Sequence, residues 1–108
     1  DVVTLHCSGE QMLLTEERLR HLKAGCVLLN PARGGLVDET ALIELLRAGH
    51  VAGAWFDTFE HEPYSGPLTQ LRNVVLTPHV GSYTEECRLQ MENEAVENLL
   101  RGLSEALR

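Results

Sequence analysis

The sequence lacks the features that would place the protein at a membrane, on nucleic acid or in an oxidising compartment. No apolar run approaches the ~20 residues of a membrane-spanning helix, and no basic region followed by an apolar one opens the chain. The nine Lys and Arg residues are scattered, and a formal net charge of -7 repels a phosphate backbone. The three cysteines form no Cys-x-x-Cys pair, which suits a reducing compartment. We therefore expect a cytoplasmic protein with neither nucleic acid nor membrane as a partner.

What is present has the size and composition of one globular unit. The chain has 108 residues, of which 44% are hydrophobic and 23% charged. Its first residues, Asp1 to Leu5, resemble the interior of a protein entering a strand, and no initiator Met precedes them. We expect a fragment of a longer protein.

Short apolar runs alternate with helical patterns along the first three quarters of the chain. Thr15 and Asp38 are suitable N-caps for two helices, which Gly25 and Gly49 close. Each run is apolar at successive positions, as in strands covered on both faces. This α/β pattern predicts an open parallel sheet with right-handed crossovers and helices on both faces. The four runs are Val2 to Leu5, Cys26 to Leu29, Val51 to Phe56 and Val74 to Thr77.

The last quarter predicts a long helix. Ser82 and Glu85 have the spacing of a capping box, so we expect the helix to start at about residue 82 and Gly102 to fray its end. Before it, Glu60 to Arg72 has loop chemistry and no room for a full crossover helix. The helix has one apolar face, formed by Met91, Ala95, Val96, Leu99, Leu100 and Leu103.

Polar residues follow every predicted strand, at the edge where parallel sheets bind ligands. Arg33 precedes a Gly-Gly pair that would let the backbone approach a ligand closely, and its guanidinium suits a carboxylate. His79, between a Pro and a Val-Gly pair, could exchange a proton at neutral pH. Glu62 would favour the charged imidazolium and orient the ring if its loop folds back toward His79. The alternatives are a surface salt-bridge arginine, a buried structural histidine and a solvated acid.

Other constellations predict no chemistry. His61 and Glu62 begin like a zinc-protease helix, but Ser65 stands at the second His position and Pro63 interrupts the helix. We therefore expect no metal site. The sequence does not identify a base that would activate Cys7 as a nucleophile, so we interpret Cys7 as a packing residue.

Three ordered blocks match something specific: NPARGGLVDE at 30–39, DTFEHEP at 57–63 and NVVLTPHVGS at 73–82. Their order and spacing resemble the D-isomer-specific 2-hydroxyacid dehydrogenases, the group that includes phosphoglycerate dehydrogenase. The resemblance covers almost the whole chain. It implies the later half of a Rossmann-type, doubly wound NAD-binding domain over residues 1–108, whose last helix leads back to a substrate domain.

The resemblance also implies the reaction and its residues. The reaction would be a reversible hydride transfer between NAD and C2 of a small 2-hydroxy acid. Separately from the resemblance, we expect a homodimer. Arg33 would bind the substrate carboxylate, His79 would move the hydroxyl proton, and Glu62 would hold His79 charged. Asp57 would lie near the nicotinamide carboxamide. The residues implied to line the cofactor site are His6, Cys7, Asn30, Ala32, Arg33, Asp57, His79 and Gly81.

Two departures and two alternatives accompany the resemblance. Ser8 stands where the family usually has Pro, and no Gly-x-Gly-x-x-Gly occurs, so we expect the chain alone to bind NAD weakly or not at all. One alternative is a non-catalytic NAD-sensing or corepressor-like protein. The other is an interaction module that dimerises through an exposed sheet edge, since half a sheet invites association. The choice of 2-hydroxy acid, and of NAD or NADP, stays open.

Overall fold

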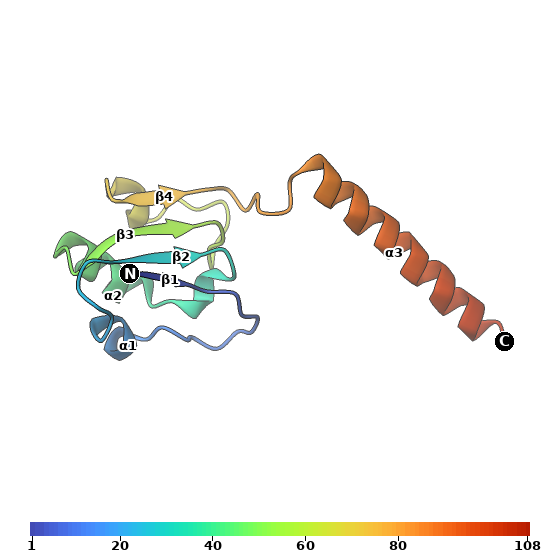
Figure 1. Ribbon diagram of the computed structural model, residues 1–108, viewed down its shortest axis with the longest axis horizontal. Helices are drawn as coiled ribbons and strands as arrows, with labels where there is room; N and C mark the ends of the chain where they lie inside the picture. Colours follow the sequence, from blue (N-terminus) through green and yellow to red (C-terminus); the bar gives the residue numbers. More distant parts are fainter.

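The computed structural model describes residues 1–108 and is built on one four-stranded parallel sheet (Figure 1). Its strands, in the spatial order β1-β2-β3-β4, are β1 (Val2–Thr4), β2 (Cys26–Asn30), β3 (Val51–Phe56) and β4 (Val74–Leu76). The predicted α/β class and parallel sheet are confirmed. Two strands end one residue earlier than expected, although the N–H groups of Leu5 and Thr77 still donate to the neighbouring strands at 3.0 Å.

The first two helices begin at the expected caps. Helix α1 spans Glu16–Arg20 and α2 spans Glu39–Arg47. The Thr15 and Asp38 side chains each accept a backbone N–H three residues further on, at 3.5 and 3.1 Å. These bonds satisfy donors that a helix N-terminus would otherwise leave without a partner. A short 3-10 helix at Gly34–Leu36 precedes α2. Another, at Pro67–Gln70, is the one helix between β3 and β4, so these strands are joined without a full crossover helix, as predicted.

The helices cover one face of the sheet only, which corrects the expectation of helices on both faces. Helix α1 contacts α2, and α2 contacts β3, so both lie on the same side. In β2, Cys26 and Leu28 are buried while Val27 and Leu29 are half-buried. The physical reason is the strand order: successive right-handed crossovers in one direction place every connection on the same face. The other face leaves Val2 and Val75 62% and 60% exposed.

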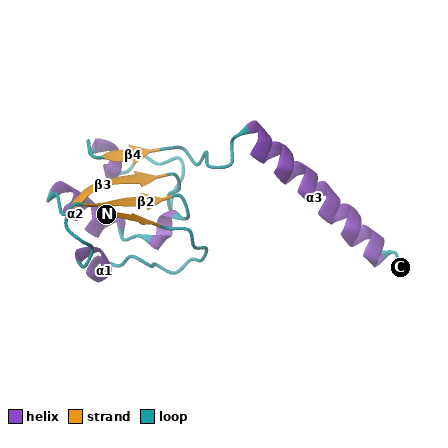
Figure 2. Ribbon diagram, viewed as in Figure 1, coloured by secondary structure: helices purple, strands orange, loops and turns teal.

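Helix α3 spans Glu85–Ala106 and projects away from the sheet (Figure 2). It makes the molecule 61 Å long and about 26 Å wide, and none of its residues is buried. The expected capping box at Ser82 is wrong, because the cap is Thr84, whose Oγ1 accepts the N–H of Cys87 at 3.2 Å. Gly102 does not end the helix, since the 22-residue helix continues through it. None of the helices combines the length and the apolar character needed to cross a membrane.

The core between the sheet and its helices supplies the first test. Leu28 is fully buried at the centre of β2, beside Val3 and Ala54 on the neighbouring strands. Leu28→Ala is expected to lower the free energy of unfolding by about 2–5 kcal/mol, because the cavity it leaves collapses only partly. Urea unfolding followed by the fluorescence of Trp55, the single tryptophan, measures this.

Leu103→Ala is the matched control, because this leucine on α3 is 50% exposed. It should change the free energy of unfolding by less than about 0.5 kcal/mol. Equal losses in the two variants would contradict the assignment of the core to the helix-covered face of the sheet.

Candidate active site

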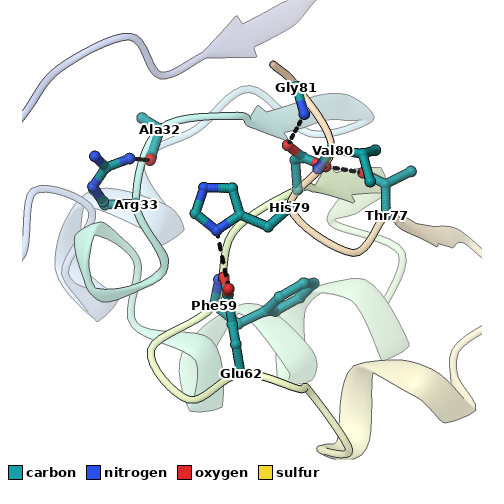
Figure 3. A network of polar contacts seen from close by, with 9 residues as sticks. Ala32, Arg33, Phe59, Glu62, Thr77, His79, Val80 and Gly81 are labelled. Atoms are coloured by element: carbon teal, nitrogen blue, oxygen red, sulfur yellow. Dashed lines mark hydrogen bonds and ion pairs between the residues drawn. The ribbon is translucent and has the colours of Figure 1, made fainter. Parts of the chain in front are cut away.

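Two loops at the carboxyl edge of the sheet bring a histidine and a carboxylate together. His79 follows β4, and Glu62 lies in the loop after β3 (Figure 3). His79 Nδ1 lies 2.9 Å from Glu62 Oε2, and Glu62 Oε1 accepts the N–H of Phe59 at 2.9 Å. The contact on which a proton-transfer dyad depends is therefore present. The His79 side chain is 52% exposed, so a substrate can reach it.

The charge state of Glu62 follows from these contacts. Its pKa is lowered, first by the hydrogen bond to His79 and then by the Phe59 N–H, which together outweigh desolvation and the Asp57 charge. A carboxyl with a lowered pKa is ionised throughout the neutral range. Because Nδ1 faces this carboxylate, Nε2 is the ring nitrogen left to meet a substrate; Figure 3 shows it on the opposite side of the ring.

The backbone of His79 is held in an unusual conformation. With φ at 57°, it is the chain's one non-glycine residue in the left-handed region. This conformation costs about 1–3 kcal/mol and persists only where surrounding contacts enforce it. The carboxylate of Asp57 supplies such contacts: Oδ1 accepts the N–H of Val80 at 3.0 Å and Oδ2 accepts that of Gly81 at 2.9 Å. A Cβ at Gly81 would lie 3.1 Å from Oδ2, so glycine suits this close approach.

Asp57 itself is buried and ionised. It is 2% exposed, and it also accepts the hydroxyl proton of Thr77 at 2.6 Å. Desolvation is the largest influence and raises the pKa of Asp57, but the hydrogen bonds from Thr77, Val80 and Gly81, with the His79 charge, lower it overall. The Asp57 carboxylate thus stabilises the turn at residues 79–81 of its own chain. Its expected place near a nicotinamide carboxamide stays a prediction.

The loop that carries Glu62 is anchored at its base. Tyr64 donates its hydroxyl proton to Glu39 Oε1 at 2.5 Å, and burial, aided by this bond, raises the pKa of Tyr64 to about 12. Its ring stacks on Phe59 with the ring centroids 4.4 Å apart. These contacts fix the loop against the start of α2, and Glu62 lies between Phe59 and Tyr64 in sequence.

The Arg33 loop touches the Glu62 loop through Gly34. A Cβ at Gly34 would lie 2.3 Å from the backbone of Phe59 and Glu60, so only glycine fits there. The close approach at Gly34 is therefore made to the backbone of the Glu62 loop. At the neighbouring Gly35 a Cβ would meet nothing within 4 Å.

Arg33 lies on the same edge but does not touch the dyad. Its guanidinium donates to the carbonyl of Ala32 at 2.7 Å, and the residue is exposed (Figure 3). Asn30 shapes the loop: it is fully buried, donating to the Arg33 carbonyl at 2.8 Å and accepting the Ala32 N–H at 3.1 Å. The Arg33 side chain is consequently free to reorient, whereas its backbone is held.

A shallow cavity of about 380 Å³ lies beyond the carboxyl ends of β1 and β2. It brings together four residues expected to line a cofactor site, and His6 in its wall hydrogen-bonds Thr4 at 2.9 Å. An open hollow with a mixed polar and apolar lining, at this edge of a parallel sheet, lies where α/β proteins bind ligands. The cavity is lined by His6, Cys7, Ser8, Pro31, Ala32 and Arg33.

Two residues of the site were not anticipated from the sequence. Trp55 donates a hydrogen bond to Thr77, and Thr77 donates one to Asp57, whereas in the sequence both belong only to predicted strands. The one available signal was the position of Thr77, directly before the Pro-His pair.

A histidine–carboxylate pair and an open hollow, both at the carboxyl edge of a parallel sheet, are the arrangement of an α/β protein that binds a ligand at that edge. Residues 1–81 match the model of the D-isomer specific 2-hydroxyacid dehydrogenase, NAD binding domain. The chain belongs to this family.

Sequence relatives and solved structures support the assignment to this family. Glyoxylate reductase from Thermofilum pendens is 44% identical over 108 residues, which cover 95% of this chain and 32% of the relative. A Thermus thermophilus protein of known structure has a TM-score of 0.89 and 48% identity, over 96% of this chain and 35% of its own. An acyclic imino acid reductase, solved with NADPH and D-Arg, has a TM-score of 0.90 and 34% identity, over 97% and 35%. The chain thus spans about a third of the length of these proteins.

Proposed function

We propose that the protein carrying this chain is a nicotinamide-dependent D-2-hydroxyacid dehydrogenase that reduces a small 2-oxo acid such as glyoxylate. The observation that carries the proposal is the 2.9 Å contact between His79 and Glu62 at the carboxyl edge of the family's NAD binding domain. The name of the Thermofilum pendens relative supports glyoxylate as the first substrate to test.

The proposed roles follow from the positions of the side chains. The bound nicotinamide supplies the hydride. His79, charged and held through Nδ1, donates the Nε2 proton to the C2 oxygen as the alcohol forms. Arg33 turns from the Ala32 carbonyl to bind the substrate carboxylate with its two-pronged guanidinium. The hollow at His6 to Arg33 receives part of the cofactor.

Oxidation of NADH and of NADPH, followed with glyoxylate and a panel of 2-oxo acids, tests the proposal. We expect turnover of at least one acid with one of the cofactors and a product of D configuration where C2 becomes chiral. Binding of NADH without turnover of any acid would overturn the proposal and favour the non-catalytic sensor.

The expected partners and location belong to the proposal as well. An uncovered sheet face and an unburied α3 support association into a homodimer. Three free cysteines without a disulfide support the cytoplasm.

Glu62→Gln tests the electrostatic role of the carboxylate, because it removes the charge and keeps the size. The rate of reduction should fall roughly tenfold above neutral pH and less in acid, since the imidazolium loses its counter-charge. The basic limb of the kcat/KM profile should accordingly move to lower pH. Steady-state rates between about pH 5 and pH 9 measure this movement across the range in which histidine titrates.

The acidic limb should stay where it is. The pKa of Glu62 is lowered in the folded protein. Its carboxylate is therefore fully charged above the ordinary carboxyl pKa, and this charge is lost only as the pH falls through the lowered pKa. Glu60→Gln, in the same loop and exposed, is the matched control and should leave the whole profile in place. A basic limb that moves equally in both variants would contradict the assignment.

A further inference from the structure

A chain of hydrogen bonds links three side chains to the turn that carries His79. Trp55 Nε1 lies 3.0 Å from Thr77 Oγ1, which lies 2.6 Å from Asp57 Oδ1. The indole N–H can only donate, so the Thr77 oxygen accepts it and its own proton is free for a second partner. The Asp57 carboxylate accepts the hydrogen bond from this hydroxyl, because the one other acceptor, the carbonyl of Phe56, is 3.5 Å away.

The three side chains come from segments whose relative positions the sheet fixes. Trp55 pairs with Val75 across β3 and β4, and the N–H of Thr77 donates to Phe56 at 3.0 Å. Asp57 follows Phe56 directly, and its N–H donates to Asn30 at 3.2 Å. The backbone of Asp57 is therefore fixed to β2, and its carboxylate is held by the hydroxyl of Thr77.

The opposite end of the Asp57 carboxylate grips the turn that presents His79. It holds the N–H groups of Val80 and Gly81, the two residues after His79, whose own backbone is left-handed. Rotation of the carboxylate would release both N–H groups together. None of Trp55, Thr77 or Asp57 makes a hydrogen bond to the His79 ring.

We infer that Trp55 and Thr77 are positioning residues, which fix the Asp57 carboxylate so that the turn 77–81 holds the His79 ring against Glu62. This inference rests on the proposed function for its kinetic consequences. A misplacement of ~1 Å at a reacting group can cost on the order of 100-fold in rate. The hydroxyl of Thr77 is the member that can be removed with least change of shape.

Thr77→Val in the protein carrying this chain is the main variant. We expect kcat to fall about tenfold or more, a larger factor than any rise in KM for the nicotinamide cofactor, because the dyad is displaced while the hollow at His6 is untouched. Thr77→Ser restores the hydroxyl and should recover most of the lost kcat. Trp55→Phe, which removes the N–H donor together with part of the ring and leaves the Thr77–Asp57 bond in place, should lower kcat by a smaller factor.

Thr69→Val is the matched control, because the Thr69 hydroxyl donates only to the carbonyl of Gly66 in an exposed turn. It should leave kcat unchanged. If Thr77→Val lowers the melting temperature but leaves kcat per folded site at the wild-type value, or if Thr77→Ser does not recover activity, the inference is overturned.

A spectroscopic readout separates this inference from the proposed function. Histidine-selective ¹⁵N labelling identifies the Nδ1 resonance of His79 as the one moved by Glu62→Gln. Thr77→Val should move that resonance in the same direction, and Thr69→Val should not. This comparison needs no turnover: a protein that reduces no 2-oxo acid would sink the proposed function, whereas an unmoved resonance in Thr77→Val would sink the positioning role.

Discussion

His79→Asn is expected to lower kcat for the reduction of glyoxylate by 10²–10⁴-fold, roughly the factor that a positioned general acid supplies. Asparagine is chosen because it tolerates the left-handed backbone that His79 adopts at φ 57°, so the turn gripped by Asp57 should survive. The loss then reports the missing proton donor at Nε2 rather than a collapsed loop. Steady-state oxidation of NADH, with the KM for each substrate, measures it.

His61→Asn is the control for this substitution. His61 is exposed, lies in the same loop as Glu62 and makes no side-chain hydrogen bond in the structure, so its removal should change kcat less than about twofold. If the His79→Asn variant oxidises NADH at the wild-type rate, His79 is not the proton donor of the proposed reaction. The dyad with Glu62 would then be a surface ion pair only.

Arg33→Gln is expected to lower kcat/KM for the 2-oxo acid by about 10²–10³-fold, as when a preorganised donor to a developing charge is removed. Glutamine keeps a polar chain of similar reach but loses the charge and the two parallel N–H groups that match a carboxylate. The backbone of the loop should stay in place, since Asn30 binds the Arg33 carbonyl and the Ala32 N–H rather than the guanidinium. The ratio of kcat/KM values between wild type and variant measures the loss.

Arg33→Lys and Arg47→Gln bracket that result. Lysine retains the charge without the fork and should lie between wild type and Arg33→Gln. Arg47 is an exposed residue at the end of α2, remote from the carboxyl edge, and its conversion to glutamine should leave kcat/KM unchanged. An Arg33→Gln enzyme with normal kcat/KM would show that the guanidinium stays at the Ala32 carbonyl during turnover.

The order of helices and strands could be predicted from the sequence, because it depends on local chemistry. Thr15 and Asp38 cap their helices as expected, because a short polar side chain satisfies the free N–H groups wherever a helix begins. The same reasoning failed at the start of α3, where Ser82 and Thr84 are both suitable caps and only the path of the chain after His79 selects Thr84. The uncovered sheet face was also beyond the sequence, since an apolar run does not reveal on which side its neighbours lie.

For the site, the sequence by itself determined which residues are candidates and at which edge of the sheet they gather. Arg33, Glu62 and His79 each follow a strand, and parallel strands end at one edge. Only the tertiary structure decided which of them meet: Tyr64 and Gly34 hold the Glu62 loop so that its carboxylate reaches His79, while the Arg33 guanidinium stays apart. The physical reason is that a 2.9 Å contact across 17 residues of sequence depends on packing far from either partner. The same holds for Thr77, which meets Trp55 and Asp57 only when β3 and β4 pair.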